Sequence, residues 1–125
     1  MSSKNNKPSE SSSRIKVEHL EEPKNSAFIK LNGYLQRQEA NDILMVVNSL
    51  QNEGVLNIVF DMTEVTYANS SAIGAFVNSA SSLKAVGGRV ILLGMQEDIK
   101  RVFDTLGLLA IFKLASTREE ALNFQ

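Results

Sequence analysis

Two apolar runs are the feature of this sequence that most restricts its fold. The segments "VLNIVF" at 55–60 and "RVILLG" at 89–94 are nearly continuous, rich in β-branched residues, and lack the polar alternation of a half-exposed strand. Strands of this kind are buried on both faces, and helical segments between them indicate crossovers that join parallel strands. The sequence therefore predicts a single α/β domain with a mostly parallel central sheet and helices packed against it.

Apolar residues recur at helical spacing between and after these runs, which predicts three internal helices that each end near a glycine. The three stripes are Ala40, Ile43, Val47 and Leu50; Ile73, Phe76, Val77, Ala80 and Leu83; and Ile99, Val102, Phe103 and Leu106. A last short strand is expected in "IFKLA" (111–115), followed by a terminal helix in "STREEAL" (116–122). Thr117 and Glu120 have the spacing of a capping box for that helix.

The amino-terminal part of the chain divides into a tail and a hairpin. Residues 1–13 are serine-rich and hold no aliphatic residue after Met1, so they are expected to form a disordered tail before a domain at 14–125. "RIKVEHL" (14–20) and "SAFIKLNG" (26–33) then alternate between apolar and polar residues and are joined by a turn-rich connection. This pattern predicts a hairpin that gives the sheet an antiparallel edge.

Composition excludes several classes of protein. The 13 basic and 14 acidic residues give no basic excess, so no direct nucleic-acid partner is expected. The absence of cysteine excludes thiol catalysis, disulfides and zinc–thiolate sites. The apolar runs are too short to span a bilayer, and the amino terminus lacks the apolar core of a secretory signal. A cytoplasmic protein without a membrane partner is the expectation.

The stretch "TYANSSAIGAF" (66–76) places two hydroxyl side chains, Ser70 and Ser71, where a strand gives way to a helix. One interpretation is helix capping, in which Asn69 or Ser70 accepts a free amide of the first turn. The other is that Ser71 is a phosphorylation site. A phosphate of about −1.5 to −2 charges would meet unpaired amides and the positive end of the helix dipole there. The residues alone leave both interpretations open.

Catalytic and ligand-binding motifs are missing from this stretch and from the rest of the chain. Asn69 and Ile73 occupy the glycine positions of a G-x-S-x-G nucleophile elbow, and the single histidine, His19, is expected on the inward face of the first strand as a packed or edge residue. No phosphate-binding glycine loop is present. The candidate metal-binding carboxylates are scattered, and are interpreted as surface charges or helix caps: Asp61, Glu64, Glu97 and Asp98. No catalytic residue, cofactor or metal is therefore predicted, and the chain is not expected to be an enzyme.

The segment from Asn57 to Leu108 resembles the central motif of STAS domains, specifically those of bacterial anti-sigma factor antagonists. The resemblance extends from about Ile15 to Phe124. Its most specific parts are the apolar strand before Asp61, the turn "NSSAIG", the segment "VGGRVILLG" and the helix pattern I-x-x-VF-x-x-LGL. "LNGYL" fits the G-x-L/I-D element of the family.

This resemblance implies a partner switch that regulates transcription. The unphosphorylated antagonist would sequester an anti-sigma factor that is also a serine kinase with a histidine-kinase-like ATPase fold. Phosphorylation of the serine that opens the helix would release the kinase, and a PP2C-type phosphatase would reverse the modification. The phospho-acceptor of the family falls on Ser71, with Ser70 as the alternate, and a monomer or weak dimer is expected.

Two positions depart from the family pattern, because Asn69 and Gln36 each replace an aspartate. These changes favour an alternative, a STAS scaffold that is not phosphorylated, or a ligand-sensing module within a larger regulatory assembly. The expected partner-binding surface consists of Gln36, Arg37, Asn69, Ser70, Ser71, Ile73, Asn78 and Ser82.

Overall fold

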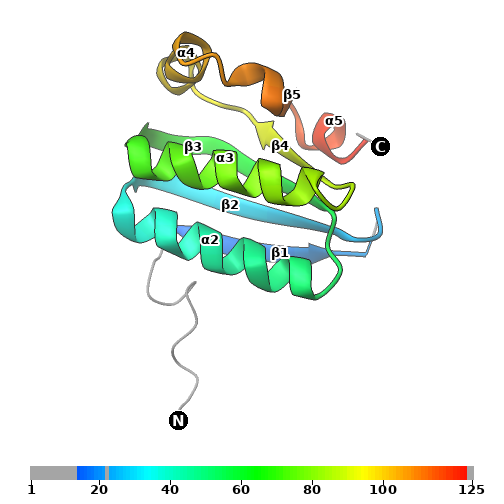
Figure 1. Ribbon diagram of the computed structural model, residues 1–125. Helices are drawn as coiled ribbons and strands as arrows, with labels where there is room; N and C mark the ends of the chain where they lie inside the picture. The colour runs from blue at the N-terminus through cyan, green and yellow to red at the C-terminus, as the bar shows by residue number, and fades with distance from the viewer. Residues whose placement is uncertain (1–13, 22, 124–125) are drawn as a thin grey trace.

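The central feature of the structure is a mixed sheet whose strands lie side by side in chain order (Figure 1). The computed structural model describes residues 14–21 and 23–123, so the predicted tail at 1–13 lies outside the described residues. The strands are β1 (Ile15–Leu20), β2 (Ser26–Leu35), β3 (Asn57–Ala68), β4 (Arg89–Leu93) and β5 (Lys113–Ala115). β1 pairs antiparallel with β2, and all other neighbours pair parallel. The predicted fold class, with its antiparallel amino-terminal edge, is confirmed.

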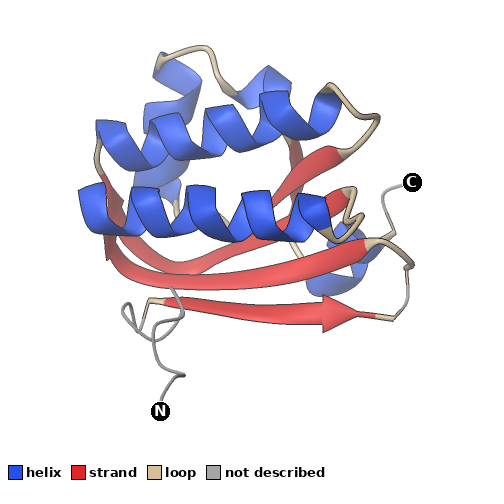
Figure 2. Cartoon of the chain, turned by 60° about the horizontal axis from the view of Figure 1, so that its bottom comes forward, coloured by secondary structure: helices blue, strands red, loops and turns tan. Residues whose placement is uncertain are grey.

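The helices that connect the parallel strands all pack on one face of the sheet. The helices are α2 (Arg37–Asn52), α3 (Ser70–Lys84), α4 (Glu97–Thr105), the 3-10 turn η1 (Leu109–Ile111) and α5 (Arg118–Leu122). Since each crossover leads to the next strand in the same direction, right-handed connections place α2, α3 and α4 on the same side. Figure 2 shows helices gathered over one side of the strands. Only α5, which follows the last strand, packs with buried residues of the opposite face.

The main core lies between the sheet and helices α2, α3 and α4. A chain of aromatic contacts runs through it. The ring centroids of Phe60 and Phe76 are 5.0 Å apart, those of Phe76 and Phe103 are 6.2 Å apart, and those of Phe103 and Phe112 are 5.7 Å apart. Edge-on and tilted arrangements of this kind are the favoured geometries of aromatic pairs. These contacts connect β3 to α3, α4 and the segment before β5.

The opposite face of the sheet carries a smaller apolar cluster under α5. Its buried members are Phe28, Val59, Ile91, Leu93, Ala115 and Ala121. The guanidinium of Arg118 lies 4.2 Å from the ring centroid of Phe28 and so covers its face. Burial on both faces is therefore confirmed for β4, in which Val90 through Leu93 are all buried.

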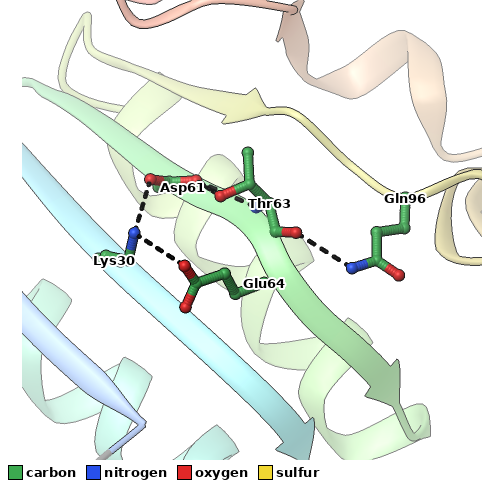
Figure 3. A network of polar contacts seen from close by, with 5 residues as sticks. All are labelled: Lys30, Asp61, Thr63, Glu64 and Gln96. Atoms are coloured by element: carbon green, nitrogen blue, oxygen red, sulfur yellow. Dashed lines mark hydrogen bonds and ion pairs between the residues drawn. The ribbon is translucent and has the colours of Figure 1, made fainter.

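Beyond the reach of α5, the same face carries a polar network rather than a second core (Figure 3). Asp61 accepts hydrogen bonds from the backbone N–H and the hydroxyl of Thr63, at 3.0 and 2.7 Å. The ammonium of Lys30 lies 3.8 Å from Asp61 and 3.4 Å from Glu64, and the amide of Gln96 donates to the carbonyl of Thr63 at 3.0 Å.

This network corrects the expectation for Asp61, which is not a surface charge, whereas Glu64 is exposed as expected. Asp61 is only 8% exposed, and the two carboxylates share one cation. The register of the parallel strands is the reason, because it pairs Lys30 with Asp61 across β2 and β3. Glu97 and Asp98 do lie in the first turn of α4, where the helix dipole favours negative charge.

β3 is longer than the apolar run that predicted it. The run ends at Phe60, whereas the strand continues to Ala68 because the ten-residue β2 provides a partner along its length. The last pair in the register is Leu35 with Ala68. Both strands therefore end at the same edge of the sheet, and a helix begins directly after each of them.

Candidate functional site

The candidate site is the turn between β3 and α3. Asn69 is the N-cap of α3, with extended backbone angles, and its side-chain oxygen accepts a hydrogen bond of 3.0 Å from the backbone N–H of Ala72. Asn and Asp are strongly preferred at this position because they satisfy an amide that has no partner within the helix. The structure thus decides between the two predicted caps in favour of Asn69.

Because Asn69 performs the capping, both serine hydroxyls are left for other roles. Ser70 and Ser71 are the first two residues of α3, and both are exposed. Their backbone N–H groups precede the first intrahelical bond, which Ile73 donates to the carbonyl of Asn69 at 3.0 Å. Within the described part of the chain, no protein acceptor is found for these two N–H groups. An oxyanion at this position would therefore meet free donors and the positive end of the dipole.

The amino terminus of α2 lies beside this turn. The backbone N–H of Asn69 donates to the carbonyl of Leu35 at 3.0 Å, so Gln36, the N-cap residue of α2, lies next to Asn69. The backbone N–H of Gln36 donates a hydrogen bond of 2.9 Å to the side-chain carboxylate of Glu39. Gln36 and Arg37 are both exposed. The structure therefore brings 36–37 and 69–71 together at one edge of the sheet, as the predicted contact surface requires.

Asn78 and Ser82 lie further along α3 and line a groove of about 290 Å³ between α2 and α3. The hydroxyl of Ser82 donates to the side-chain oxygen of Gln51 at 2.7 Å, which ties the two helices together across the groove. Helical spacing places Ser71, Asn78 and Ser82 on the same exposed stripe of α3.

Ile73 is placed differently from the other residues of the predicted surface. Its side chain is 8% exposed and belongs to the main core, together with Ala72 and Phe76. Ile73 therefore positions the start of α3 by packing against the sheet, and its side chain presents little area to a partner.

A pair of tyrosines beside the site was not identified from the sequence. Tyr34 and Tyr67 are directly paired across β2 and β3, and their ring centroids are 5.7 Å apart. They are 57% and 44% exposed. A signal for this pair exists in the sequence, because each tyrosine stands two residues before the N-cap of the following helix, Gln36 or Asn69. Equal spacing before two neighbouring helix starts predicts adjacency in a parallel sheet.

The single histidine lies away from this turn. His19 lies on the same face of β1 as the inward residues Ile15 and Val17, as expected, but its side chain is 61% exposed, so it is an edge residue and not a packed one. The reason is its place near the end of the edge strand, where its ring is 3.0 Å from Glu53, just past the end of α2.

Metal ligation and membrane insertion find no structural basis in the described part of the chain. Among the described residues, no group of three or more His, Asp and Glu side chains could hold a metal ion. Over the same ranges, 14–21 and 23–123, every helix is too short or too polar to cross a bilayer.

The five-stranded mixed sheet with its helices defines the class of protein as a small α/β domain. The family model of the STAS domain matches residues 16–121, and the chain belongs to the STAS domain family. Its relatives include the putative anti-sigma factor antagonist BtrV of Bordetella bronchiseptica, 25% identical over 73% of this chain and 78% of that protein. The anti-sigma-B factor antagonist of Listeria monocytogenes is 31% identical over 54% of this chain and 59% of that protein.

Solved structures agree with this assignment at the level of the fold. The anti-sigma factor antagonist SpoIIAA in its unphosphorylated form superposes with a TM-score of 0.76 over 87% of this chain and 93% of that one, at 24% identity. The phosphorylated form of SpoIIAA, described as a Bacillus cell fate determinant, gives a TM-score of 0.71 over 87% of this chain and 96% of that one, also at 24% identity.

Proposed function

We propose that this chain is an anti-sigma factor antagonist that works as a phosphorylation-controlled binding module and not as an enzyme. In its unphosphorylated form it sequesters an anti-sigma factor that is also a serine kinase with a histidine-kinase-like ATPase fold. Phosphorylation of Ser71 releases that partner, and a PP2C-type phosphatase restores binding. The names of the relatives and the existence of SpoIIAA in both phosphorylation states support this proposal.

The observation that carries the proposal is the position of Ser71 in the first turn of α3. The hydroxyl is exposed to a modifying enzyme, and Asn69 already supplies the cap. The first turn of α3 contains no acidic side chain, so a phosphate there meets no like charge within its own turn. A negative group at a helix start contributes about 0.3–1 kcal/mol of stability. The domain can therefore accept the modification without unfolding.

A docked partner responds differently to the same group. A contact that fits an uncharged hydroxyl must desolvate a phosphate of about −1.5 to −2 charges, and any acidic residue of the partner would repel it. Each loss of about 1.4 kcal/mol weakens binding tenfold. Tolerance in the fold combined with intolerance at the interface is the physical basis of the switch.

The contact surface consists of the residues that the fold gathers around Ser71. It comprises the paired helix starts, with Gln36, Arg37, Asn69, Ser70 and Ser71, and the exposed stripe of α3 with Asn78 and Ser82. The side chain of Ile73 is left out because it is buried. We add Tyr34 and Tyr67 at its rim, since exposed tyrosines are common at protein interfaces.

The experiment that tests this function compares Ser71→Ala with Ser71→Asp as affinity baits, and identifies proteins held by the first and released by the second. The purified partner is then incubated with ATP and wild-type protein, and the phosphate is mapped by mass spectrometry. Phosphate at residue 71, lost in Ser71→Ala and kept in Ser70→Ala, supports the proposal. Phosphate only at residue 70 would move the switch by one position.

The second candidate function is a STAS scaffold or ligand-sensing module without phosphorylation. The feature that favours it is the loss of two family aspartates, now Asn69 and Gln36. A complex of equal stability with Ser71→Ala and Ser71→Asp, unaffected by ATP and kinase, would select this candidate over the switch.

A further inference from the structure

A large cavity lies at the far end of α3 from Ser71. It has a volume of about 560 Å³ and is bounded by the last turns of α3, the start of β4 and the segment from η1 into β5. α3 has 15 residues, so Lys84 lies roughly 20 Å along the helix axis from Ser71. The cavity is therefore separate from the proposed contact surface, and its capacity to bind a ligand does not depend on the proposed switch.

The cavity exists because β5 begins opposite the third residue of β4 and leaves the first two without a partner strand on that side. Lys113, the first residue of β5, pairs with Ile91, so Arg89 and Val90 have no strand residue opposite them on that side. The backbone N–H of Arg89 bonds to the carbonyl of Leu56, toward β3. Successive residues of a parallel strand point their N–H groups to opposite neighbours. The backbone N–H of Val90 thus faces the gap, although Val90 itself is only 2% exposed.

Positive charge is concentrated around this gap. Lys84, Arg89 and Lys113 all line the cavity, but from two sides. Alternation along β4 and β5 places Arg89 and Lys113 on the face of Ile91 and Ala115, whereas Lys84 comes from α3 on the other face. The segments that form it, residues 80–93 and 105–117, contain no Asp or Glu at all. Within residues 14–21 and 23–123, none of the three cations forms an ion pair. In a chain with a formal net charge of −1, three such cations at one cavity are a local excess.

The simplest structural role covers only part of this cluster. Lys84 stands in the last turn of α3, where a cation complements the helix dipole. That role does not explain Arg89, which is half-buried at the start of a strand without a carboxylate partner among the described residues. A guanidinium presents several donors in a plane, which suits the oxygens of a phosphate. Half-exposed Ile111 adds apolar surface to the cavity.

We propose that this cavity binds a small phosphorylated ligand at the open edge of β4. Its phosphate lies between Lys84 on one side of the edge and Arg89 and Lys113 on the other, and its organic part lies against Ile111. The volume falls within the range of small-molecule sites, about 300–1,000 Å³, and exceeds what inorganic phosphate alone would fill. The N–H of Val90 donates to a phosphate oxygen.

The test is a titration of the full chain with phenyl phosphate and with inorganic phosphate, monitored by amide chemical shifts at constant ionic strength. Phenyl phosphate is expected to change the amide chemical shift of Val90 strongly and that of Ser71 not at all. It is also expected to bind more tightly than inorganic phosphate. Arg89→Gln is expected to weaken binding by about tenfold, the loss of a charge-assisted hydrogen bond. The matched control is Lys16→Gln, which removes one exposed cation from β1 and keeps wild-type affinity.

Several outcomes would overturn the proposal. Amide shifts spread over lysines across the surface would show general charge attraction only. The same conclusion would follow if Arg89→Gln and Lys16→Gln weakened phosphate binding equally. Equal affinity for phenyl phosphate and inorganic phosphate would show that Ile111 makes no contact with the organic part, and would contradict the proposal. If Arg89→Gln unfolds, its place is taken by the double variant Lys84→Gln/Lys113→Gln, which changes exposed side chains only. Its affinity for phenyl phosphate is then compared with that of Lys16→Gln. If the wild-type protein floats with phosphatidylglycerol vesicles and Arg89→Gln does not, the phosphate belongs to a lipid headgroup. That result would contradict a free ligand.

Discussion

Removing the cap at the start of α3 tests how the switch serine is presented. Asn69→Ala deletes the oxygen that accepts the 3.0 Å hydrogen bond from Ala72, and leaves that amide without its acceptor. Substitutions of this kind cost about 0.5–2 kcal/mol, typically ~1. Since the unfolding free energy falls by ~2 kcal/mol per molar urea, a loss of ~1 kcal/mol should lower the urea midpoint of unfolding by about 0.5 M. Urea unfolding followed by far-ultraviolet circular dichroism measures this shift.

Two variants provide the matched comparison for that experiment. Asn69→Asp keeps the acceptor and adds a charge that the dipole favours, so its unfolding free energy should equal or exceed the wild-type value by up to ~1 kcal/mol. Asn78→Ala removes the same side chain from an exposed position within α3, where alanine has the higher helix propensity, and stability should not fall. Equal midpoints for wild type and Asn69→Ala, or a loss in Asn78→Ala as large as in Asn69→Ala, would refute the assignment of the cap.

The remaining predictions concern packing and surface charge, each checked by the same unfolding measurement. Gly88→Ala should destabilise the domain by more than about 2 kcal/mol, because its Cβ would clash with the carbonyl oxygen of Leu56. Gly74→Ala meets no atom within 4 Å and should stabilise α3 by up to ~1 kcal/mol. Phe76→Ala should lose about 3–5 kcal/mol, since this buried ring contacts both Phe60 and Phe103; a loss below ~1 kcal/mol would contradict the aromatic core. Glu53→Gln should change stability by less than about 1 kcal/mol, because its partner His19 and Glu53 itself are both more than half exposed.

The sequence predicted the core elements because their signals are local. The stripe from Ile73 to Leu83 fixed both the extent of α3 and the face it buries, and glycines mark helix ends at Gly54, Gly87 and Gly107, each with a positive φ angle. Such glycines occupy a backbone conformation that other residues adopt with strain. Helix periodicity and end signals can therefore be identified without any knowledge of the tertiary structure.

Features that depend on pairing between distant segments could not be predicted in the same way. The extension of β3 to Ala68 requires the long partner β2, and the burial of Asp61 requires Lys30 opposite it. The exposure of His19 depends on where α2 ends above the edge strand. The alternation of β1 predicts the face on which His19 lies, but not how far α2 extends over that face.

The candidate site shows the same division. Ser70 and Ser71 were located from a local change of pattern, and the structure gives both of them exposed side chains. The adjacency of Gln36 to Asn69 depends on the parallel register of β2 and β3, as does the pairing of Tyr34 with Tyr67. Ile73 was assigned to the contact surface by its nearness in sequence, while the helical rotation directs its side chain into the core.

The proposed switch requires that one negative charge at residue 71 is tolerated by the domain and weakens the binding of its partner. The most direct measurement compares Ser71→Asp with Ser71→Ala in two quantities, the unfolding free energy and the dissociation constant for the isolated partner kinase. Ser71→Asp should have an unfolding free energy equal to that of Ser71→Ala or higher by up to ~1 kcal/mol, and should bind the partner at least about tenfold more weakly. Equal affinities for the two variants, or an unfolding free energy lowered enough to explain the weaker binding, would contradict the proposed switch.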